Sequence, residues 1–444
     1  FTFRATRVGA DTSLAKIIQL VEDANATEAP IARMADKVAG VFVPVVFMIS
    51  AVTFVVWTAL TGSVNEALTS AVAVLVISCP CALGLATPVA IMVGTGKGAE
   101  MGILFKSAEA LENLRSVGTV VLDKTGTVTR GKPAVTDITV ATRADGSPAM
   151  SEKALLKLAA ALERSSEHPL AEAIMAECEA RGIVARMVED FTAVPGRGVT
   201  AREGQNVIAA GNVRLMDELG VKVPAGLAEQ FAAEGKTPLF FAKNSELVGT
   251  IAVADEVKET SAGAIAALRS LGVDVRMLTG DNRVTAEAIA RRVGLSSEQV
   301  IADVLPADKE RHVRELQDVG GKVAMVGDGI NDSPALARAD VGLAIGTGAD
   351  IAKEGADVVL MRSDLMDVAR AIELSRATIR NIKQDLFWAL FYNGIGIPLA
   401  AGVFFPLTGW QLSPMFGAAA MSLSSVCVVS NALRLKSFKP KVAK

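Results

Sequence analysis

The chain has 444 residues, enough for about three domains of ordinary size, and its composition excludes several classes of protein. A total of 45 basic and 48 acidic residues leaves a formal charge of −3, which argues against a nucleic-acid-binding protein held by bulk positive charge. Four cysteines in a chain of this size exclude a small secreted module stapled by disulfides. A mean hydropathy of +0.39 beside 21% charged residues indicates that apolar residues are concentrated in a few segments.

Three stretches of the chain carry no charge, namely 38–65, 67–96 and 386–433. Because a membrane helix needs about 20 apolar residues, they predict four spans, the last two joined by a turn at 406–414. Buried core helices of a large soluble enzyme are the alternative, and uncharged runs of this length are rare in such cores. Basic residues flank the spans at both termini of the chain and at both ends of the segment 97–383. The positive-inside rule therefore places both termini and this segment in the cytoplasm.

Between the second and third spans, short apolar runs alternate with amphipathic helices, which predicts a doubly wound parallel α/β sheet. Three of the expected strands lie at 119–122, 273–278 and 323–326. They end in Asp123, in Thr279-Gly280-Asp281 and in Gly327-Asp328-Gly329, with Asn331 and Asp332 following. Since ligands of such sheets lie beyond the carboxyl ends of the strands, we expect a phosphate-handling site at this edge.

Asp123 is the predicted nucleophile of that site. A carboxylate at a strand tip can attack a phosphoryl group and become an aspartyl phosphate. The reaction needs charge neutralisation by Mg²⁺ and a cation, for which Asp328 and Lys309 are the natural metal ligand and ammonium group. A hydrolase of this chemistry would carry a second carboxylate two residues on as its acid and base, where this chain has Thr125. We therefore expect the covalent intermediate to persist long enough to be used.

Residues 135–247 interrupt the alternating pattern and read as a separate small domain. His168 precedes Pro169, which biases it towards an extended backbone and a presented ring, although a lone histidine is more often structural. Gly196-Arg197-Gly198 permits close approach to a ligand, and Gly211-Asn212 adds a second flexible corner; we expect Arg197 itself at the surface. Each feature alone also fits an ordinary turn.

Cys79-Pro80-Cys81 lies in the middle of the second predicted span. Proline breaks the helix locally, and unwound backbone inside a membrane is tolerated where it lines a site. Two thiolates there suit soft cations: Cu(I), Ag(I), Zn(II) or Cd(II). Two small buried side chains beside a structural kink are the alternative interpretation.

The last two spans favour a monovalent ion. Zn(II) or Cd(II) would gain from an intramembrane carboxylate or lysine, and 386–433 contains neither. Tyr392 and Asn393 are polar neighbours in the third span, while Met421 and Ser425 lie four residues apart and share a helix face. We interpret Cys427 as a packing residue.

Taken together, these motifs resemble those of a known family. Asp123-Lys124-Thr125-Gly126-Thr127, Thr279-Gly280-Asp281 and the Gly-Asp-Gly-Ile-Asn-Asp run at 327–332 look like the three phosphorylation-domain signatures of P-type ATPases. Cys-Pro-Cys, Tyr-Asn and Met-x-x-x-Ser resemble the Cu(I)-exporting subgroup of the heavy-metal (P1B) branch. The resemblance covers essentially the whole chain. It implies a haloacid-dehalogenase-like phosphorylation domain, an inserted α+β nucleotide-binding domain and ATP-driven export of Cu(I) or Ag(I).

The resemblance also assigns roles to residues. Asp123 would be phosphorylated, with Mg²⁺ held by Asp123, Asp328 and the Thr125 main chain and supported by Asp332. The phosphoryl oxygens would be bound by Thr279, Gly280, Lys309 and Asn331, and Asp281 would be a further catalytic residue. ATP would be oriented by Glu163 and His168 in a pocket lined by Gly196, Gly198, Gly211 and Asn212. The Cu(I) pathway would use Cys79, Cys81, Tyr392, Asn393, Met421 and Ser425, with Asp36 at its cytosolic entrance.

The expected organisation follows from these assignments. It comprises 1–37 as actuator exit and lead-in helix, 38–96 and 384–435 as pairs of spans, 97–134 and 248–383 as phosphorylation domain, 135–247 as nucleotide domain and 436–444 as cytosolic tail. The chain has no Thr-Gly-Glu actuator motif, no leading pair of spans and no Gly-Met-x-Cys-x-x-Cys domain, so we expect a fragment or a processed chain. Expected partners are the lipid membrane, the missing N-terminal half and a cytosolic copper chaperone, with no nucleic acid. The expected location is a bacterial inner membrane.

Three other functions remain open at this point. A Zn(II)- or Cd(II)-exporting P1B ATPase is disfavoured by the missing intramembrane carboxylate. A membrane-anchored aspartyl-phosphate phosphatase is disfavoured by Thr125. A soft-metal sensor with a vestigial ATPase domain is disfavoured by the intact set of Asp123, Lys309 and Asp328.

Overall fold

The computed structural model describes residues 13–143, 145–166, 169–194, 196–305, 308–328, 332–346 and 355–442. Two compact units share the chain. One comprises Phe1–Gly118, Leu316–Ala324 and Leu336–Lys444, and the other comprises Thr119–Glu315 and Met325–Ala335.

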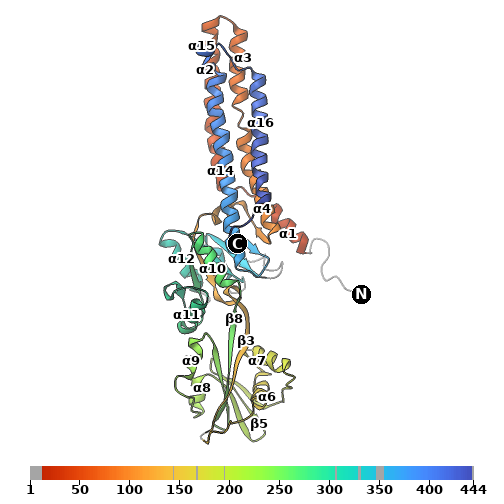
Figure 1. The fold of residues 1–444 in the computed structure, drawn as a ribbon, viewed down its shortest axis with the longest axis vertical. Helices are drawn as coiled ribbons and strands as arrows, with labels where there is room; N and C mark the ends of the chain where they lie inside the picture. The colour runs from red at the N-terminus through yellow and green to blue at the C-terminus, as the bar shows by residue number, and fades with distance from the viewer. Residues whose placement is uncertain are drawn as a thin grey trace, which may run out of the picture. The chain divides into compact units, whose positions relative to one another are not determined.

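The first unit holds the apolar helices. They are Ser13–Ala26 (α1), Pro30–Thr61 (α2), Val64–Ile77 (α3), Cys81–Glu100 (α4), Met366–Ala400 (α14), Phe405–Thr408 (α15) and Pro414–Leu433 (α16). Of these, α2, α3, α14 and α16 lie side by side as a bundle (Figure 1), and the unit also contains two short helices, α1 and α15. Among the described helical stretches, Ile18–Thr61 and Pro414–Ser437 are long and apolar enough to cross a membrane, and α3 is apolar but shorter. The four predicted spans correspond to α2, to α3 with α4, to the second half of α14 and to α16.

The second predicted span is broken where the proline predicts it. Helix α3 ends at Ile77 and α4 begins at Cys81, with Pro80 as its N-terminal cap. Pro80 has no N–H to donate to the preceding turn, and the Ser78 hydroxyl donates to the Val74 carbonyl at 2.6 Å, which closes the end of α3.

Ile77 anchors this break inside the bundle. Its side chain is 4% exposed and packs in an apolar cluster with Val46 of α2 and Ala400 of α14. Glycines make room for it on two neighbouring helices. A Cβ at Gly396 of α14 would lie 2.7 Å from Ile77 Cδ1, and one at Gly417 of α16 would lie 3.6 Å from Ile77 Cβ.

The α/β sheet has seven strands among the described residues, in the order β1-β13-β12-β11-β2-β9-β10. They are Ile103–Phe105 (β1), Val117–Asp123 (β2), Asp274–Leu278 (β9), Val300–Ile301 (β10), Lys322–Gly327 (β11), Val341–Ile345 (β12) and Val358–Leu360 (β13). β2 pairs parallel with β9, β9 with β10, and β12 with β13, whereas β1 is an antiparallel edge strand. The associated helices are Ala108–Leu114 (α5), Ser261–Ser270 (α10), Arg283–Arg292 (α11), Lys309–Asp318 (α12) and Ser333–Arg338 (α13).

The inserted domain is built on an antiparallel sheet in the order β3-β8-β7-β6-β5-β4. Its strands are Thr129–Val140 (β3), Glu189–Val194 (β4), Gly198–Glu203 (β5), Asn206–Gly211 (β6), Thr237–Lys243 (β7) and Glu246–Val257 (β8). Its helices are Glu152–Glu163 (α6), Pro169–Ala180 (α7), Val213–Glu218 (α8) and Leu227–Ala233 (α9). The predicted limits of this domain, 135 and 247, fall inside β3 and β8, which pair along most of their length.

Candidate functional site

Asp123 is the last residue of β2 and lies opposite Leu278 in the register with β9. This pairing brings Thr279, directly after β9, to the same sheet edge. Both side chains are buried, Asp123 at 5% and Thr279 at 2% exposure. The chain then turns through Lys124–Val128, where Gly126 has a positive φ of 74° that favours glycine. The predicted convergence of strand ends is therefore present.

Lys309 joins two acids of the site. It opens α12, and its Nζ lies 2.6 Å from Asp123 Oδ1 and 2.6 Å from Asp332 Oδ1. Burial disfavours its charged form, but Asp123 and Asp332 outweigh burial and raise the pKa of Lys309. The ammonium group is therefore held charged next to the predicted nucleophile.

The carboxylates of this site carry more negative charge than one lysine balances. Burial, followed by Asp332, raises the pKa of Asp123 to about 6, with a smaller contribution from Asp328. Burial also raises the pKa of Asp332. Asp328 lies beside the turn, since a Cβ at Gly126 would be 3.3 Å from Asp328 Oδ2.

This donor set fits a magnesium ion. Carboxylate and carbonyl oxygens are the ligands Mg²⁺ prefers, and Asp123 and Asp328 supply them beside the Thr125 main chain. The hydroxyl of Thr127 is buried and has no hydrogen-bond partner among the described residues, so one polar group at the turn is left for a ligand. A divalent cation would relieve the mutual repulsion that raises the pKa of Asp123.

A second ion pair lies at the same edge. Lys124 Nζ is 2.7 Å from Asp281 Oδ2, and the Asp281 amide donates to the Thr279 hydroxyl at 3.1 Å. Asp281 is thus held by Lys124, a residue to which the sequence reasoning gave no role. Gly280 lies close to Val304, because a Cβ added at Gly280 would be 3.1 Å from the Val304 carbonyl oxygen. Asn331 lies outside the described residues.

Two further residues that the sequence reasoning missed hold the phosphorylation turn in place. Asp255 of β8 accepts hydrogen bonds from the Thr129 hydroxyl and from the Gly131 amide, the latter at 2.9 Å. Lys258 Nζ donates to the Gly126 carbonyl at 2.7 Å. No local motif marks them, because they reach the turn only through the pairing of β3 with β8.

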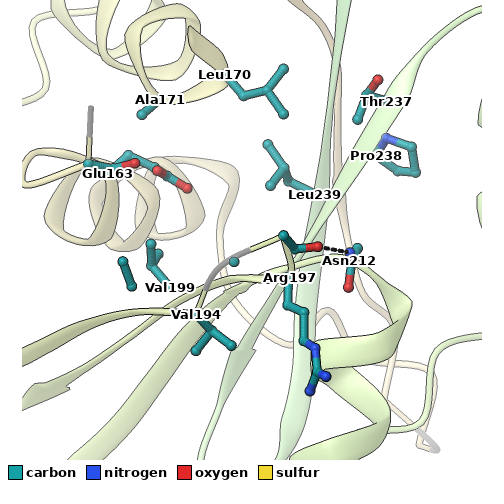
Figure 2. A pocket seen from close by; sticks show the side chains of 14 residues that line it. Glu163, Leu170, Ala171, Val194, Arg197, Val199, Asn212, Thr237, Pro238 and Leu239 are labelled. Atoms are coloured by element: carbon teal, nitrogen blue, oxygen red, sulfur yellow. Dashed lines mark hydrogen bonds between the residues drawn. The ribbon is translucent and has the colours of Figure 1, made fainter. Parts of the chain in front are cut away.

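The inserted domain contains a cavity of about 330 Å³ between α6, α7 and the sheet. Figure 2 shows Glu163 and Leu170 on the helical side, with Leu239 and Arg197 on the side of the sheet. Its lining is Glu163, Ser166, Leu170, Ala171, Ala193, Val194, Gly196, Arg197, Gly198, Val199, Asn212, Thr237, Pro238 and Leu239. An apolar cleft with few polar groups suits a flat heterocycle such as adenine.

Glu163 is the buried acid of this cavity. Its side chain is 4% exposed, and burial raises the pKa of Glu163 to about 7, only partly opposed by a hydrogen bond from Ser166. Near neutral pH this carboxyl group therefore exists partly as the neutral acid, which both donates and accepts hydrogen bonds.

The glycines of the nucleotide domain divide into two groups. Gly196 and Gly198 line the cavity, but Gly211 does not. Gly198 and Gly211 face each other across β5 and β6. A Cβ added at Gly198 would lie 2.1 Å from the Ala210 carbonyl oxygen, and one added at Gly211 would lie 2.4 Å from the Arg197 carbonyl oxygen. The two glycines therefore permit close packing of backbone on backbone.

Asn212 lines the cavity as predicted, whereas Arg197 differs from its predicted role. The Asn212 side chain caps α8 and donates to the Gly196 carbonyl at 3.0 Å, so it holds the loop that lines the cavity (Figure 2). The expectation that Arg197 is only a surface residue is incomplete, because it lines the cavity and pairs with Glu218. His168 lies outside the described residues, so its predicted contact with the adenine stays a prediction.

In the bundle, two of the predicted ion ligands lie about one helical turn from the contacts that Ile77 makes. Ile77 is in contact with α14 near Gly396 and with α16 near Gly417. Asn393 lies one turn before Gly396 on α14, and Met421 lies one turn after Gly417 on α16. Both therefore lie on the side of Ile77 towards which the chain continues. Asn393 is 5% exposed, and Met421 packs against the Ile77 cluster. Ser425 donates to the Met421 carbonyl at 3.3 Å.

The remaining predicted ligands are placed differently. The sulfurs of Cys79 and Cys81 lie next to each other at the break between α3 and α4, so the two predicted thiol ligands are brought together. Tyr392 is 41% exposed and lines a separate cavity between α14 and α16, away from Asn393. Cys427 lines that cavity too and is exposed on α16, and its interpretation as a packing residue stays a prediction. Asp36 is exposed on α2.

Asp385 is a buried acid that directly precedes the uncharged stretch 386–433. It is 3% exposed, and its Oδ1 accepts a hydrogen bond from Asn431 Nδ2 at 2.9 Å. Its Oδ2 and the Oδ1 of Asn381, one turn earlier on α14, are buried with no partner among the described residues. A carboxylate therefore lies between α14 and α16, one residue before the stretch 386–433 that contains no acidic residue.

Comparisons with known proteins identify the class. Residues 117–340 match the haloacid dehalogenase-like hydrolase family. The fold is similar to a crystal structure of a zinc-transporting PIB-type ATPase in its E2.Pi state, with a TM-score of 0.77, 35% identity, and coverage of 97% of this chain and 68% of that one. The chain belongs to the P-type ATPases, in their heavy-metal PIB branch, as its three signatures predict.

The similar curated proteins are copper transporters. The probable copper-transporting ATPase PacS of Synechococcus elongatus is 52% identical over 99% of this chain and 58% of its own length. The copper-exporting P-type ATPase of Bacillus subtilis is 50% identical over 98% of this chain and 53% of its own length. This chain thus spans little more than half the length of these relatives.

Proposed function

We propose that the chain is the catalytic and ion-site part of an ATP-driven exporter of Cu(I), with Ag(I) as a second cargo. The observation that carries the proposal is that one chain contains both a buried Asp123 held by Lys309 and a membrane helix broken at Cys79-Pro80-Cys81. The copper-transporting names of relatives at 50–52% identity support the choice of metal.

The phosphorylation domain supplies the chemistry. A carboxylate oxygen of Asp123 forms a bond to the γ-phosphorus of ATP as the bond to the bridging oxygen breaks, so that ADP leaves with the electron pair. Lys309 and Thr279 lie at the same edge to contact the phosphoryl oxygens. Asp123, Asp328 and the Thr125 main chain would hold Mg²⁺, which would supply charge neutralisation for the transferred group.

The inserted domain holds the base of ATP. The cavity beside Glu163 is large enough for adenine, and the partly neutral carboxyl group offers both a donor and an acceptor to the ring. In the sequence, His168 lies between Ser166 and Leu170, which line this cavity. We propose that it orients the adenine as well. Asn212 lines the cavity and also holds the Gly196 loop.

The bundle carries the ion. We propose that Cys79 and Cys81 bind Cu(I) as thiolates. Asn393, Met421 and Ser425 lie next along the path, and Asp36 marks its entrance. The protein is an integral membrane protein, and we propose a bacterial inner membrane with the catalytic domains in the cytoplasm. Its proposed partners are a copper chaperone and an N-terminal half with the actuator domain.

A specific observation also favours a second candidate, Zn(II) or Cd(II). Asp385 is a buried carboxylate between α14 and α16, and such a group helps to balance a divalent charge. The similar crystal structure is a zinc-transporting ATPase. Cu(I) remains the first choice because the identity to this zinc-transporting relative is 35%, against 50–52% for the copper-transporting ones.

Phosphorylation by radioactive ATP tests both candidates. We expect acid-stable label on the purified chain, stimulated by Cu(I) under reducing conditions and not by Zn(II). Asp123→Asn should abolish the label, because it keeps the shape and removes the nucleophile. Cys79→Ser and Cys81→Ser should abolish only the stimulation, since hydroxyls are poor ligands for Cu(I). Stimulation by Zn(II) that is lost in Asp385→Asn would establish the second candidate.

A further inference from the structure

A basic cavity lies where α14 enters its apolar half. It has a volume of about 520 Å³ and is lined by Arg115, Ser116, Arg376, Ile379, Arg380 and Lys383. Four of these six residues are cationic and none is acidic. The nucleotide and ion sites described above use none of them.

The spacing along α14 collects three of the cations on one face. Arg376, Arg380 and Lys383 lie at positions i, i+4 and i+7 and therefore share a stripe of the helix. The same stripe continues into Phe387 and Leu390, whose side chains are 59% and 39% exposed. A polar, positively charged surface thus passes directly into an exposed apolar one within about one turn of helix.

Contacts with α5 fix the fourth cation opposite this stripe. The Ser375 hydroxyl donates to the Leu111 carbonyl, and Arg376 Nε donates to the Arg115 carbonyl at 3.2 Å. Arg115 Nε is buried without a hydrogen-bond partner among the described residues. The carboxylate closest to its guanidinium, that of Glu112, is 3.9 Å away and also accepts the Ile31 amide.

We propose that this cavity binds the phosphate headgroup of an anionic phospholipid. Like charges four residues apart on a helix repel each other, so an anion among these four cations stabilises their arrangement. Arginine binds phosphate oxygens through two parallel N–H groups, and basic pockets at the cytosolic boundary of membrane helices are typical lipid-headgroup sites. The exposed Phe387 and Leu390 accommodate an acyl chain, which a soluble phosphate lacks.

The positive-inside rule alone does not account for this site. That rule asks only for basic residues near the ends of the spans, and Lys436 and Lys439 after α16 meet it as exposed side chains that line none of the described cavities. They carry the same charge on the same side, so they provide a matched control.

The test uses the chain in nanodiscs of phosphatidylcholine, with or without a third of phosphatidylglycerol. We expect phosphatidylglycerol to raise the melting temperature by several degrees and to be retained by the chain in native mass spectrometry. Arg380→Gln/Lys383→Gln should lose most of the shift and retain several-fold less lipid. Lys436→Gln/Lys439→Gln, with the same change in charge, should behave as the unchanged chain.

Two results would overturn the proposal. Equal losses in both double variants would mean that the lipid acts through bulk surface charge. A full shift produced by inorganic phosphate or glycerol phosphate in neutral nanodiscs would mean that the cavity binds a free phosphate and not a lipid. A double variant that melts normally in pure phosphatidylcholine excludes misfolding as the cause of a lost shift.

Discussion

The protonation states of single residues in this protein depend on burial and on the charged groups beside them. Glu163 and Lys309 show this in opposite directions. Glu163 ends a helix in an apolar cleft with little hydrogen bonding, so burial dominates and favours the neutral acid. Lys309 is also buried, but two carboxylates at 2.6 Å keep it charged. Each residue therefore has the protonation state that its proposed role requires.

The first prediction concerns the pH dependence of the nucleotide domain. The pKa of Glu163 is raised from 4.5 to about 7, so the folded form binds this proton more tightly than the unfolded form does. The contribution of this bound proton to the free energy of unfolding is complete below pH 4.5 and is lost as the pH rises through 7. The loss amounts to about 3 kcal/mol. Glu163→Gln stays neutral, so relative to the unchanged chain it should gain about this much between pH 4.5 and pH 8.

Hydrogen exchange of the β5–β7 amides measures this effect. Comparing variant and unchanged chain at one pH cancels the intrinsic dependence of exchange on pH. Glu172→Gln, an exposed acid on the neighbouring helix α7, is the control and should show the same protection as the unchanged chain at both pH values. A Glu163→Gln difference that is identical at pH 4.5 and pH 8 would show that Glu163 is not a shifted acid.

At the scale of elements, the break between α3 and α4 depends on how closely three helices approach. Gly396 lies against Ile77, whereas a Cβ added at Gly394, two residues earlier on α14, would meet nothing within 4 Å. The two glycines therefore separate close packing from helix propensity, since both lie in the interior of the same helix.

The second prediction uses this pair. Gly396→Ala should destabilise the bundle by about 1–3 kcal/mol, because the new methyl group must displace the buried Ile77 side chain. Gly394→Ala should be neutral or stabilising by up to about 1 kcal/mol, because alanine is the better helix former. Unfolding in mixed detergent and denaturant, with Cu(I) binding measured in parallel, checks both; equal effects of the two variants would contradict the packing argument.

At the scale of the whole molecule, phosphorylation and dephosphorylation make different demands. Attack by Asp123 needs the groups that this chain brings to one sheet edge. Hydrolysis of the aspartyl phosphate needs a positioned water and a free general base. Thr125 cannot act as a base, Asp332 is paired with Lys309, and Asp328 is a proposed metal ligand.

The third prediction follows from that difference. The 444-residue chain should form the phosphoenzyme yet show little steady-state ATP hydrolysis and no transport. Adding the N-terminal half of a relative should restore cycling, since these relatives are nearly twice as long as this chain. The measurement is ATP hydrolysis with Cu(I) in lipid, beside the label on Asp123. Sustained turnover by the chain alone would mean that one of its own carboxylates serves as the base.

The amino-acid sequence by itself determined the family, the α/β sheet with its inserted domain, and the convergence of Asp123, Thr279 and Asp328. Each of these depends on a local pattern: a run of apolar residues, a strand end or a proline between cysteines. The bond from Lys309 to Asp332, the neutral tendency of Glu163, the close pair of Gly198 and Gly211 and the buried Asp385 were decided only by the tertiary structure. Burial and interatomic distance arise from segments far apart in the chain, and no local pattern contains them.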